Sequence, residues 1–291
     1  MTPPGGSGGE AANQRAFAGH DGSAARWFAS QDDWWPEHYG SAVDQALAEL
    51  HGSGIGTEGR DLLDIGCGDG IISLGLLRRS DLGSVTGMDI VATDTGFLDH
   101  EARRHGVDPV GPDDALRFVE SVPDTAPFED SSFDLATAWS VFEHVTEPRP
   151  LLRDVHRVLR PGGVLFIQVW PLWFSEHGSH LWPFFEETFV HLTRTPEEIL
   201  AHLQERIEDP ALARSMFDLY ESCNRHTVDD IQAALLDAGF GIGKVTLSGA
   251  SVHVPPALRD VPLSHLAVDG CTILAVKPDQ PREAGPGHDP G

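Results

Sequence analysis

The sequence predicts an α/β fold in which a mostly parallel, doubly wound sheet carries helices on both faces. A short apolar run at residues 62–65 has the length of a buried parallel strand. Gly66, Gly68 and Gly70 follow it at alternate positions, and residues 71–77 then show helical apolar spacing. A strand, a glycine turn and a helix in this order present backbone N–H groups to a ligand at the carboxyl end of the strand.

A second strand is predicted at residues 83–90, and Asp89 lies at its end. In doubly wound folds an acid about 20 residues after the glycine turn binds the hydroxyls of a ribose, and Asp89 stands at about that interval after Gly70. A carboxylate can accept from both hydroxyls, and Ile90 would then give apolar contact to an adenine base. The alternative interpretation is a polar strand end without a ligand.

The remaining elements follow in order along the chain. Residues 24–50 are rich in aromatic side chains and show helical spacing, either to pack on the sheet edge or, around Trp34, His38 and Tyr39, to cover a ligand pocket. Capping boxes begin helices at Thr195 and Thr227. Further helices are predicted at 69–79, 95–105, 150–159, 195–207, 211–222 and 228–238, and strands at 116–120, 133–139, 164–169, 243–248 and 271–276.

The run Asp-Ile-Gly-Cys-Gly-Asp-Gly at 64–70 resembles the first motif of class I S-adenosyl-L-methionine (SAM)-dependent methyltransferases. A nicotinamide-binding turn would need glycine at position 71, where this chain has Ile71. Two further blocks stand in the order of that family: a Pro-Phe turn, Ser-Phe-Asp and Glu-His within 127–145, and Leu-Arg-Pro-Gly-Gly at 159–163. Together the three blocks extend over roughly residues 55 to 170.

The resemblance implies a Rossmann-like, seven-stranded, mostly parallel doubly wound sheet with a C-terminal antiparallel hairpin and a helical, aromatic cap insertion. We expect one methyltransferase domain at 16–278, with the substrate cap at 171–222. Tails at 1–15 and 279–291 are predicted to be disordered, because they contain too little apolar surface to offset the entropy of ordering.

The cofactor that the resemblance implies is SAM. Its predicted contacts are Asp64, Gly66, Cys67, Gly68, Asp69, Gly70, Asp89, Ile90, Ser121, Val122 and Ser140. One departure from the family concerns the adenine. The family places Gly-Asp-Ala after the third strand, where this chain has Ser121, Val122 and Pro123, so the acid that meets the adenine amino group is replaced by Val122. Either Asp124 substitutes for it, or the backbone at Ser121 and Val122 meets the adenine.

Histidines near the predicted cap and after the fourth strand are the candidate catalytic residues. If the acceptor is a hydroxyl, a base of near-neutral pKa assists its methylation, which suits histidine. The candidates are His177, His180 and His144, in that order, and structural roles are the alternative for each. His177 and His180 would share one face of a helical turn. Together with Glu176 they could also hold a metal, but histidine favours zinc or iron over magnesium and no Asp-Asp cluster lies nearby, so no metal is predicted.

The charge, the apolar runs and the cysteines of the chain indicate which kinds of binding partner to expect. The chain has 45 acidic and 20 basic residues and a formal net charge of −25, which disfavours nucleic acid and anionic membrane surfaces. It has neither an apolar run of about 18 residues nor a signal-peptide pattern. Its three cysteines, far apart and odd in number, fit a reducing compartment. A cytoplasmic protein with a small-molecule substrate is therefore predicted.

The predicted function is SAM-dependent methylation of a small molecule, at oxygen or nitrogen, in secondary metabolism. Two alternatives stay open: a protein of the same fold that binds SAM without transferring its methyl group, and an NAD-type oxidoreductase. The sequence leaves the acceptor and the oligomeric state undetermined.

Overall fold

The structure is a computed structural model that describes residues 23–111 and 115–279. The predicted tails at 1–15 and 279–291 lie outside these described residues, apart from Asp279. Within them, no helix is both long and apolar enough to cross a membrane.

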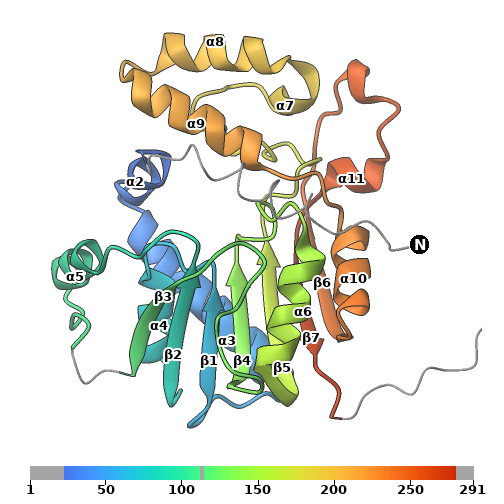
Figure 1. Ribbon diagram of the computed structural model, residues 1–291. Coiled ribbons are helices and arrows are strands. Elements are labelled where there is room, and N and C mark those ends of the chain that lie inside the picture. Colours follow the sequence, from blue (N-terminus) through green and yellow to red (C-terminus); the bar gives the residue numbers. More distant parts are fainter. Residues whose placement is uncertain (1–22, 112–114, 280–291) are drawn as a thin grey trace, which may run out of the picture.

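A seven-stranded sheet forms the centre of the molecule, in the order β3-β2-β1-β4-β5-β7-β6 (Figure 1). The strands are β1 (Asp61–Ile65), β2 (Ser84–Asp89), β3 (Leu116–Glu120), β4 (Phe133–Trp139), β5 (Leu159–Val169), β6 (Gly241–Gly249) and β7 (Val268–Val276). The first five run parallel, β7 is antiparallel to β5, and β6 is antiparallel to β7. The predicted fold, including its C-terminal antiparallel pair, is confirmed.

The central strand β1 explains where a ligand can bind. Leu62 pairs with Val85 of β2 on one side and with Leu135 of β4 on the other, and all three side chains are fully buried. The strand order therefore reverses between β1 and β4, as the chain moves first outward to β3 and then back across the sheet. Such a reversal opens a crevice at the carboxyl ends of the strands, which is where ligands of open α/β sheets bind.

Helices cover both faces of the sheet and enclose two separate apolar cores (Figure 1). One face is covered by α3 (Val43–Gly52), α4 (Ile71–Arg78) and α5 (Thr95–Arg104), and the other by α6 (Pro148–Val158) and α10 (Val228–Asp237). The predicted capping box at Thr227 is present: the Thr227 hydroxyl accepts from the Asp230 N–H, and the Asp230 carboxylate accepts from the Thr227 N–H.

A third apolar core belongs to a cap above the sheet. Its helices α7 (Val190–Thr193), α8 (Pro196–Arg206) and α9 (Pro210–Ser222) form a separate layer in Figure 1. The capping box at Thr195 begins α8 as predicted, with Glu198 as its partner. The helix α2 (Ser23–Ala29) joins this cap from the other end of the chain, because the Ala24 N–H donates to the Ser215 hydroxyl at 3.0 Å.

The aromatic segment 24–50 differs from the single helix that its spacing predicts. It divides into α2, the π-helix η1 (Pro36–Ala42) and α3. The Ser30 hydroxyl and the Gln31 amide both donate to the Trp27 carbonyl, at 2.7 and 2.9 Å, and so end α2. The first and last of these three elements pack on different parts of the molecule: α2 packs on the cap, and α3 packs on the sheet.

Two short helices that were not predicted, and a strand that begins earlier than predicted, also differ from the sequence-based expectation. Between β6 and β7 the chain forms η2 (Pro256–Leu258) and α11 (Leu263–Ala267). The strand β5 begins five residues before the predicted start, at Leu159, and its pairing with β4 shifts between Phe133 and Leu135. Glycines within 159–163 allow that irregularity, because they tolerate backbone angles that a regular strand excludes.

Candidate active site

The glycine turn after β1 has the backbone that close approach to a ligand requires. Gly66, Gly68 and Gly70 have φ angles of 66°, 52° and 80°, in the left-handed region that glycine adopts without strain. A Cβ at Gly66 would collide with the Val141 side chain. At Gly68 a Cβ would meet nothing within 4 Å, and this residue is exposed. The turn is thus packed at its base and open at its tip.

The carboxylate of Asp89 is held beside this open tip. Its Oδ2 accepts from the Gly68 N–H and its Oδ1 from the Val91 N–H, both at 2.9 Å. Burial raises the pKa of Asp89, and these backbone donors partly offset the effect. A carboxylate oxygen can accept more than one hydrogen bond, so each retains capacity for a ligand hydroxyl.

A cavity of about 170 Å³ extends from Asp89 across the carboxyl ends of the central strands. It is lined by Ile65, Gly66, Met88, Asp89, Ile90, Ser121, Val122, Pro123, Asp124, Thr125, Ser140, Val141, His144, Val145 and Leu151. Pockets for whole drug-sized ligands usually measure roughly 300–1,000 Å³, so the enclosed part accommodates only a portion of a nucleoside ligand. The exposed tip of the turn at Gly68 offers the adjoining surface.

Six of the predicted cofactor contacts line this cavity: Gly66, Asp89, Ile90, Ser121, Val122 and Ser140. Asp64 instead lies beneath the turn, where its carboxylate accepts from the Ser73 hydroxyl at 2.5 Å and the Thr137 hydroxyl at 3.0 Å. Burial is the main reason that the pKa of Asp64 rises to about 6. Asp64 therefore connects β1 with α4 and β4 rather than facing the cavity.

The predicted contacts Cys67, Asp69 and Gly70 also lie outside the cavity lining. The Cys67 thiol is buried, and its Sγ lies 3.5 Å from the Thr93 hydroxyl. Asp69 accepts from the indole N–H of Trp34 at 2.7 Å. This bond ties the aromatic N-terminal segment to the glycine turn. Trp34 and Tyr39 pack against the apolar core of that face, which agrees with the packing alternative, and neither lines the cavity.

Where the cavity is lined by residues 121–124, the slot in which the family pattern places an acid holds none. Val122 occupies it, and 55% of the side chain of Val122 is exposed. The Ser121 N–H donates to the Asp89 carbonyl at 2.8 Å, so this backbone donor already has a partner. Asp124 lines the same cavity, with a φ of 69°. The position of Asp124 fits the substitute role that the sequence left open.

The structure brings together two of the three candidate catalytic histidines. The rings of His144 and His180 lie 5.0 Å apart. His177 and His180 share a turn, since the His180 N–H donates to the His177 carbonyl at 3.0 Å, and the ring of each lies 5.8 Å from that of Trp182. The ring of His177 contacts Trp170 and Trp182, and 38% of its side chain is exposed.

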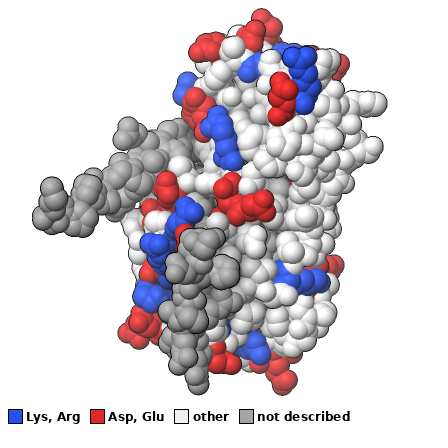
Figure 2. Space-filling view, turned by 90° about the vertical axis from the view of Figure 1, so that its right-hand side faces the viewer, with Lys and Arg blue, Asp and Glu red and all other residues white. Residues whose placement is uncertain are grey.

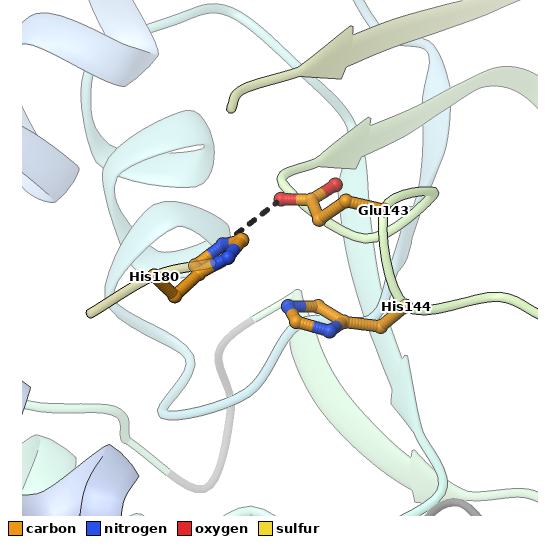
Figure 3. Close-up of side chains that lie close together, drawn as sticks. All are labelled: Glu143, His144 and His180. Atoms are coloured by element: carbon orange, nitrogen blue, oxygen red, sulfur yellow. Dashed lines mark ion pairs between the residues drawn. The ribbon is translucent and has the colours of Figure 1, made fainter. Parts of the chain in front are cut away.

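Glu143 completes this cluster, and sequence reasoning missed it (Figure 3). Only 3% of its side chain is exposed, and neither carboxylate oxygen has a hydrogen-bond partner. Burial raises the pKa of Glu143 well above its usual value. Its Oε1 lies 4.0 Å from the Nε2 of His180. The sequence does carry a sign of Glu143, because it stands beside His144 in the loop after β4, but only the histidine of that pair was taken as a candidate.

The end of α9 contacts both histidines and sets the tautomer of His144. The Ser222 hydroxyl donates to the Leu219 carbonyl at 2.7 Å, so it must accept at the Nδ1 of His144, 3.0 Å away. The Nδ1 of His144 therefore carries a proton. The Cys223 thiol lies 3.5 Å from the same carbonyl and 3.3 Å from the Nδ1 of His180, and in the latter pair either atom can be the donor.

The family described as "Methyltransferase domain" matches residues 63–167, which contain the end of β1, the glycine turn, Asp89 and Glu143–His144. Residues 63–167 therefore have the sequence pattern of a methyltransferase domain. SAM is the cofactor that this similarity implies, and the chain's residues fit it: the turn is open at Gly68, and the Asp89 carboxylate beside it can accept further hydrogen bonds.

Curated relatives of the methyltransferase domain carry one shared name. "Ubiquinone biosynthesis O-methyltransferase" of Xanthomonas oryzae pv. oryzae (strain PXO99A) is 31% identical over 152 residues, which are 51% of this chain and 60% of that protein. The protein of the same name from Pseudomonas aeruginosa (strain LESB58) is 30% identical over 145 residues, 50% of this chain and 57% of the relative. The chain thus spans about three fifths of the length of these relatives.

Solved structures share the fold of the methyltransferase domain and its cap. A candidate sarcosine dimethylglycine methyltransferase from Galdieria sulphuraria has a TM-score of 0.54 at 14% identity, over 93% of this chain and 98% of that one. A geranyl diphosphate methyltransferase in complex with SAM has a TM-score of 0.50 at 16% identity, over 85% and 92%. At these identities the likeness concerns the fold alone.

Proposed function

We propose that this protein transfers a methyl group from SAM to a hydroxyl of a small organic acceptor. The observation that carries the proposal is the single cavity lined by Asp89 at one end and by His144 at the other. It would place a nucleoside beside His144, whose ring Ser222 orients through Nδ1. The relatives named as O-methyltransferases support oxygen as the accepting atom.

The chain's residues would bind and orient the two reactants. When bound, SAM supplies a methyl group on a positively charged sulfur. Asp89 holds the ribose, and the open turn at Gly68 leaves room for the rest of the ligand. Orientation of this kind contributes on the order of 7–11 kcal/mol to lowering a barrier.

His144 would act as the general base. As the oxygen–methyl bond forms and the sulfur–methyl bond breaks, the pair of electrons of the broken bond stays on sulfur. The hydroxyl proton passes to the Nε2 of His144, while Ser222 holds the ring through Nδ1. A positioned general base typically contributes about 10²–10⁴-fold in rate.

The cap would select the acceptor. Trp182 approaches Trp170 at 5.3 Å and Phe28 at 6.2 Å between ring centroids, so segments from both ends of the cap converge there. Trp170 and Trp182 are only partly buried. Large, partly exposed aromatic side chains provide flat apolar contact area, which favours an acceptor with an apolar or aromatic body.

Calorimetric titration with SAM tests the cofactor part. Asp89→Ala should weaken binding about 10- to 100-fold, because a hydrogen bond to a charged group contributes about 1.5–3 kcal/mol. Glu120→Ala is the matched control: Glu120 pairs with Asp89 in the sheet but is exposed and outside the cavity lining. Equal affinities for Asp89→Ala and the unaltered protein would refute the assigned site.

Transfer itself is measured with methyl-labelled SAM and a panel of phenols, aliphatic alcohols and amines. We expect label in a hydroxyl-bearing compound, and His144→Ala should lower kcat about 10²–10⁴-fold. The control is His202→Ala, whose ring stacks on Phe185 and contacts the Phe184 carbonyl within the cap. Label in amines alone would contradict the oxygen acceptor, and SAM binding without transfer to any compound would favour a binding protein.

A further inference from the structure

We propose that Glu143, His144 and His180 form a binding site for one divalent transition-metal ion of the Zn²⁺ type. Each residue offers one ligand atom, and these three atoms lie within 4.8 Å of one another. Figure 3 shows the three side chains converging from two loops, with the tip of the His144 ring directed towards the other two.

The carboxylate of Glu143 is the buried group that needs a partner here. Neither of its oxygens has a hydrogen-bond partner, and its Oε1 lies 4.0 Å from the Nε2 of His180. Among the ion pairs of the described residues, Glu143 has no lysine or arginine partner. A buried carboxylate is costly unless a donor or cation compensates it.

The ligand types select the class of ion. Two imidazoles and one carboxylate suit Zn²⁺ and its neighbours in the first transition row, whereas Mg²⁺ and Ca²⁺ prefer oxygen ligands. Tetrahedral Zn²⁺ with nitrogen and oxygen ligands at about 2.0–2.2 Å places those atoms about 3.3–3.6 Å apart. The Oε1 of Glu143 and the Nε2 of His180 are 4.0 Å apart, so a small shift closes the site.

A polar side chain at the end of α9 contacts the Nδ1 of each histidine, which is the kind of support that metal-binding histidines usually have. A ligating histidine commonly donates its other ring N–H to a fixed acceptor, which orients the ring. The Ser222 hydroxyl lies 3.0 Å from the Nδ1 of His144, and the Cys223 thiol lies 3.3 Å from the Nδ1 of His180. Cys223 lies on the Nδ1 side of the His180 ring, so it supports that ligand and leaves three protein ligands and an open fourth position.

The open position would matter for the proposed methyl transfer. His144 lines the cavity, so a ligand on the ion could be the acceptor hydroxyl itself. Zn²⁺ lowers the pKa of a bound water to about 7, and an acceptor oxygen would be activated in the same way. The hydroxyl proton would then pass to solvent water as the oxygen binds the ion, and His144 would serve as a ligand in place of its role as the base. Only this consequence depends on the proposed function; the binding site does not.

Metal content tests the site directly. The full-length, tag-free protein is stripped with a chelator, dialysed against ZnCl₂ and analysed by mass spectrometry for bound zinc. We expect about one ion per chain, and we expect Glu143→Gln and His180→Ala to lose it. His177→Ala should retain it; that residue makes the matched control because it also has a glutamate neighbour, Glu176, at 3.8 Å.

A second probe separates loss of metal from loss of structure. CoCl₂ should give visible absorption bands of a four-coordinate ion in the unaltered protein and in His177→Ala only. SAM affinity, measured on the same samples, reports whether Glu143→Gln and His180→Ala are folded. Absence of bound zinc in the unaltered protein, or full zinc content in both variants, would overturn the site. Either result leaves SAM binding and transfer to be judged by their own assays.

Discussion

Two buried carboxylates near the carboxyl end of β4 have opposite surroundings. Asp64 accepts hydrogen bonds from Ser73 and Thr137, whereas neither oxygen of Glu143 has a partner. A buried carboxylate with donors can act as a structural brace, while one without them is costly unless a ligand completes it. The same functional group therefore braces the turn at Asp64, while at Glu143 it lacks the hydrogen-bond partners that such a brace needs.

The first prediction concerns the pH dependence that Asp64 causes. Its pKa rises from 3.8 to about 6 on folding, so its stabilising effect is full below 3.8 and is lost as pH rises through 6. The free energy of unfolding of the unaltered protein should fall, relative to Asp64→Asn, by up to about 3 kcal/mol between pH 4 and pH 7. Urea unfolding at several pH values measures the difference.

Asp61 provides a control, because its effect on the free energy of unfolding should change with pH in the opposite direction to that of Asp64. Hydrogen bonds from Ser84 and Arg160 lower the pKa of Asp61, so its contribution is present above the unfolded pKa and lost as pH falls. Relative to Asp61→Asn, the unaltered protein should gain stability as pH rises. Parallel pH profiles for the unaltered protein and Asp64→Asn would contradict the assignment.

The second prediction restores the missing adenine acid. Val122 lines the cavity in the slot where the family pattern has an acid, so Val122→Asp should tighten SAM binding about fivefold, equivalent to about 1 kcal/mol. Calorimetry measures it. Val91→Asp adds the same charge at an exposed valine outside the cavity lining. An equal gain in both variants would mean general attraction to the cationic ligand instead of a contact with adenine.

At the scale of elements, the helix that begins at the glycine turn is positioned by the aromatic N-terminal segment. A Cβ at Gly75 of α4 would lie 2.7 Å from Val43 Cγ2 and 3.2 Å from the Tyr39 carbonyl oxygen of η1. This close approach of α4 to η1 also places Trp34 where its indole reaches Asp69. The segment therefore supports the turn mechanically, besides any covering role.

The third prediction tests that close approach. Gly75→Ala gains up to about 1 kcal/mol of helix propensity, but overpacking typically costs about 1–3 kcal/mol, and the Tyr39 carbonyl is backbone that cannot turn away. We expect a net loss of about 1 kcal/mol in urea unfolding. Gly52→Ala, at the end of α3, meets nothing within 4 Å and should be neutral or stabilising. Stabilisation by Gly75→Ala would show that α4 and η1 separate readily.

At the scale of the whole molecule, the cap and the sheet are joined at the loop that carries the site. The Asn224 side-chain amide, just after α9, donates to the carbonyls of Phe142 and Val145, at 2.5 and 2.8 Å. His226 contacts the Thr146 carbonyl at 3.0 Å. Asn224 and His226 thus hold the loop of Glu143 and His144 against the cap.

The fourth prediction follows from the charge of the whole chain. Figure 2 shows acidic and basic side chains interspersed on one face, yet the net charge is −25. Self-repulsion of this size destabilises a compact state, and salt screens it. We expect Tm at pH 7 to rise by a few degrees between about 20 and 300 mM NaCl. The rise should shrink towards the isoelectric point near 4.7. A Tm that falls with salt would mean that surface ion pairs dominate.

The sequence by itself determined the features that depend on local backbone chemistry. The apolar run at 62–65, the glycines after it and the threonine capping boxes specify a strand, a turn and helix starts within a few residues each. Asp89 could be placed beside the turn because parallel strands bring their carboxyl ends to one edge of the sheet.

Only the tertiary structure decided which side chains meet. His180 reaches His144 and Glu143 because the end of α9 fixes both rings, while His177, three residues away, turns to the tryptophans. Asp64, inside the motif, is buried away from the cavity. The physical reason is that burial and hydrogen-bond partners depend on segments far apart in the chain, which local patterns do not encode.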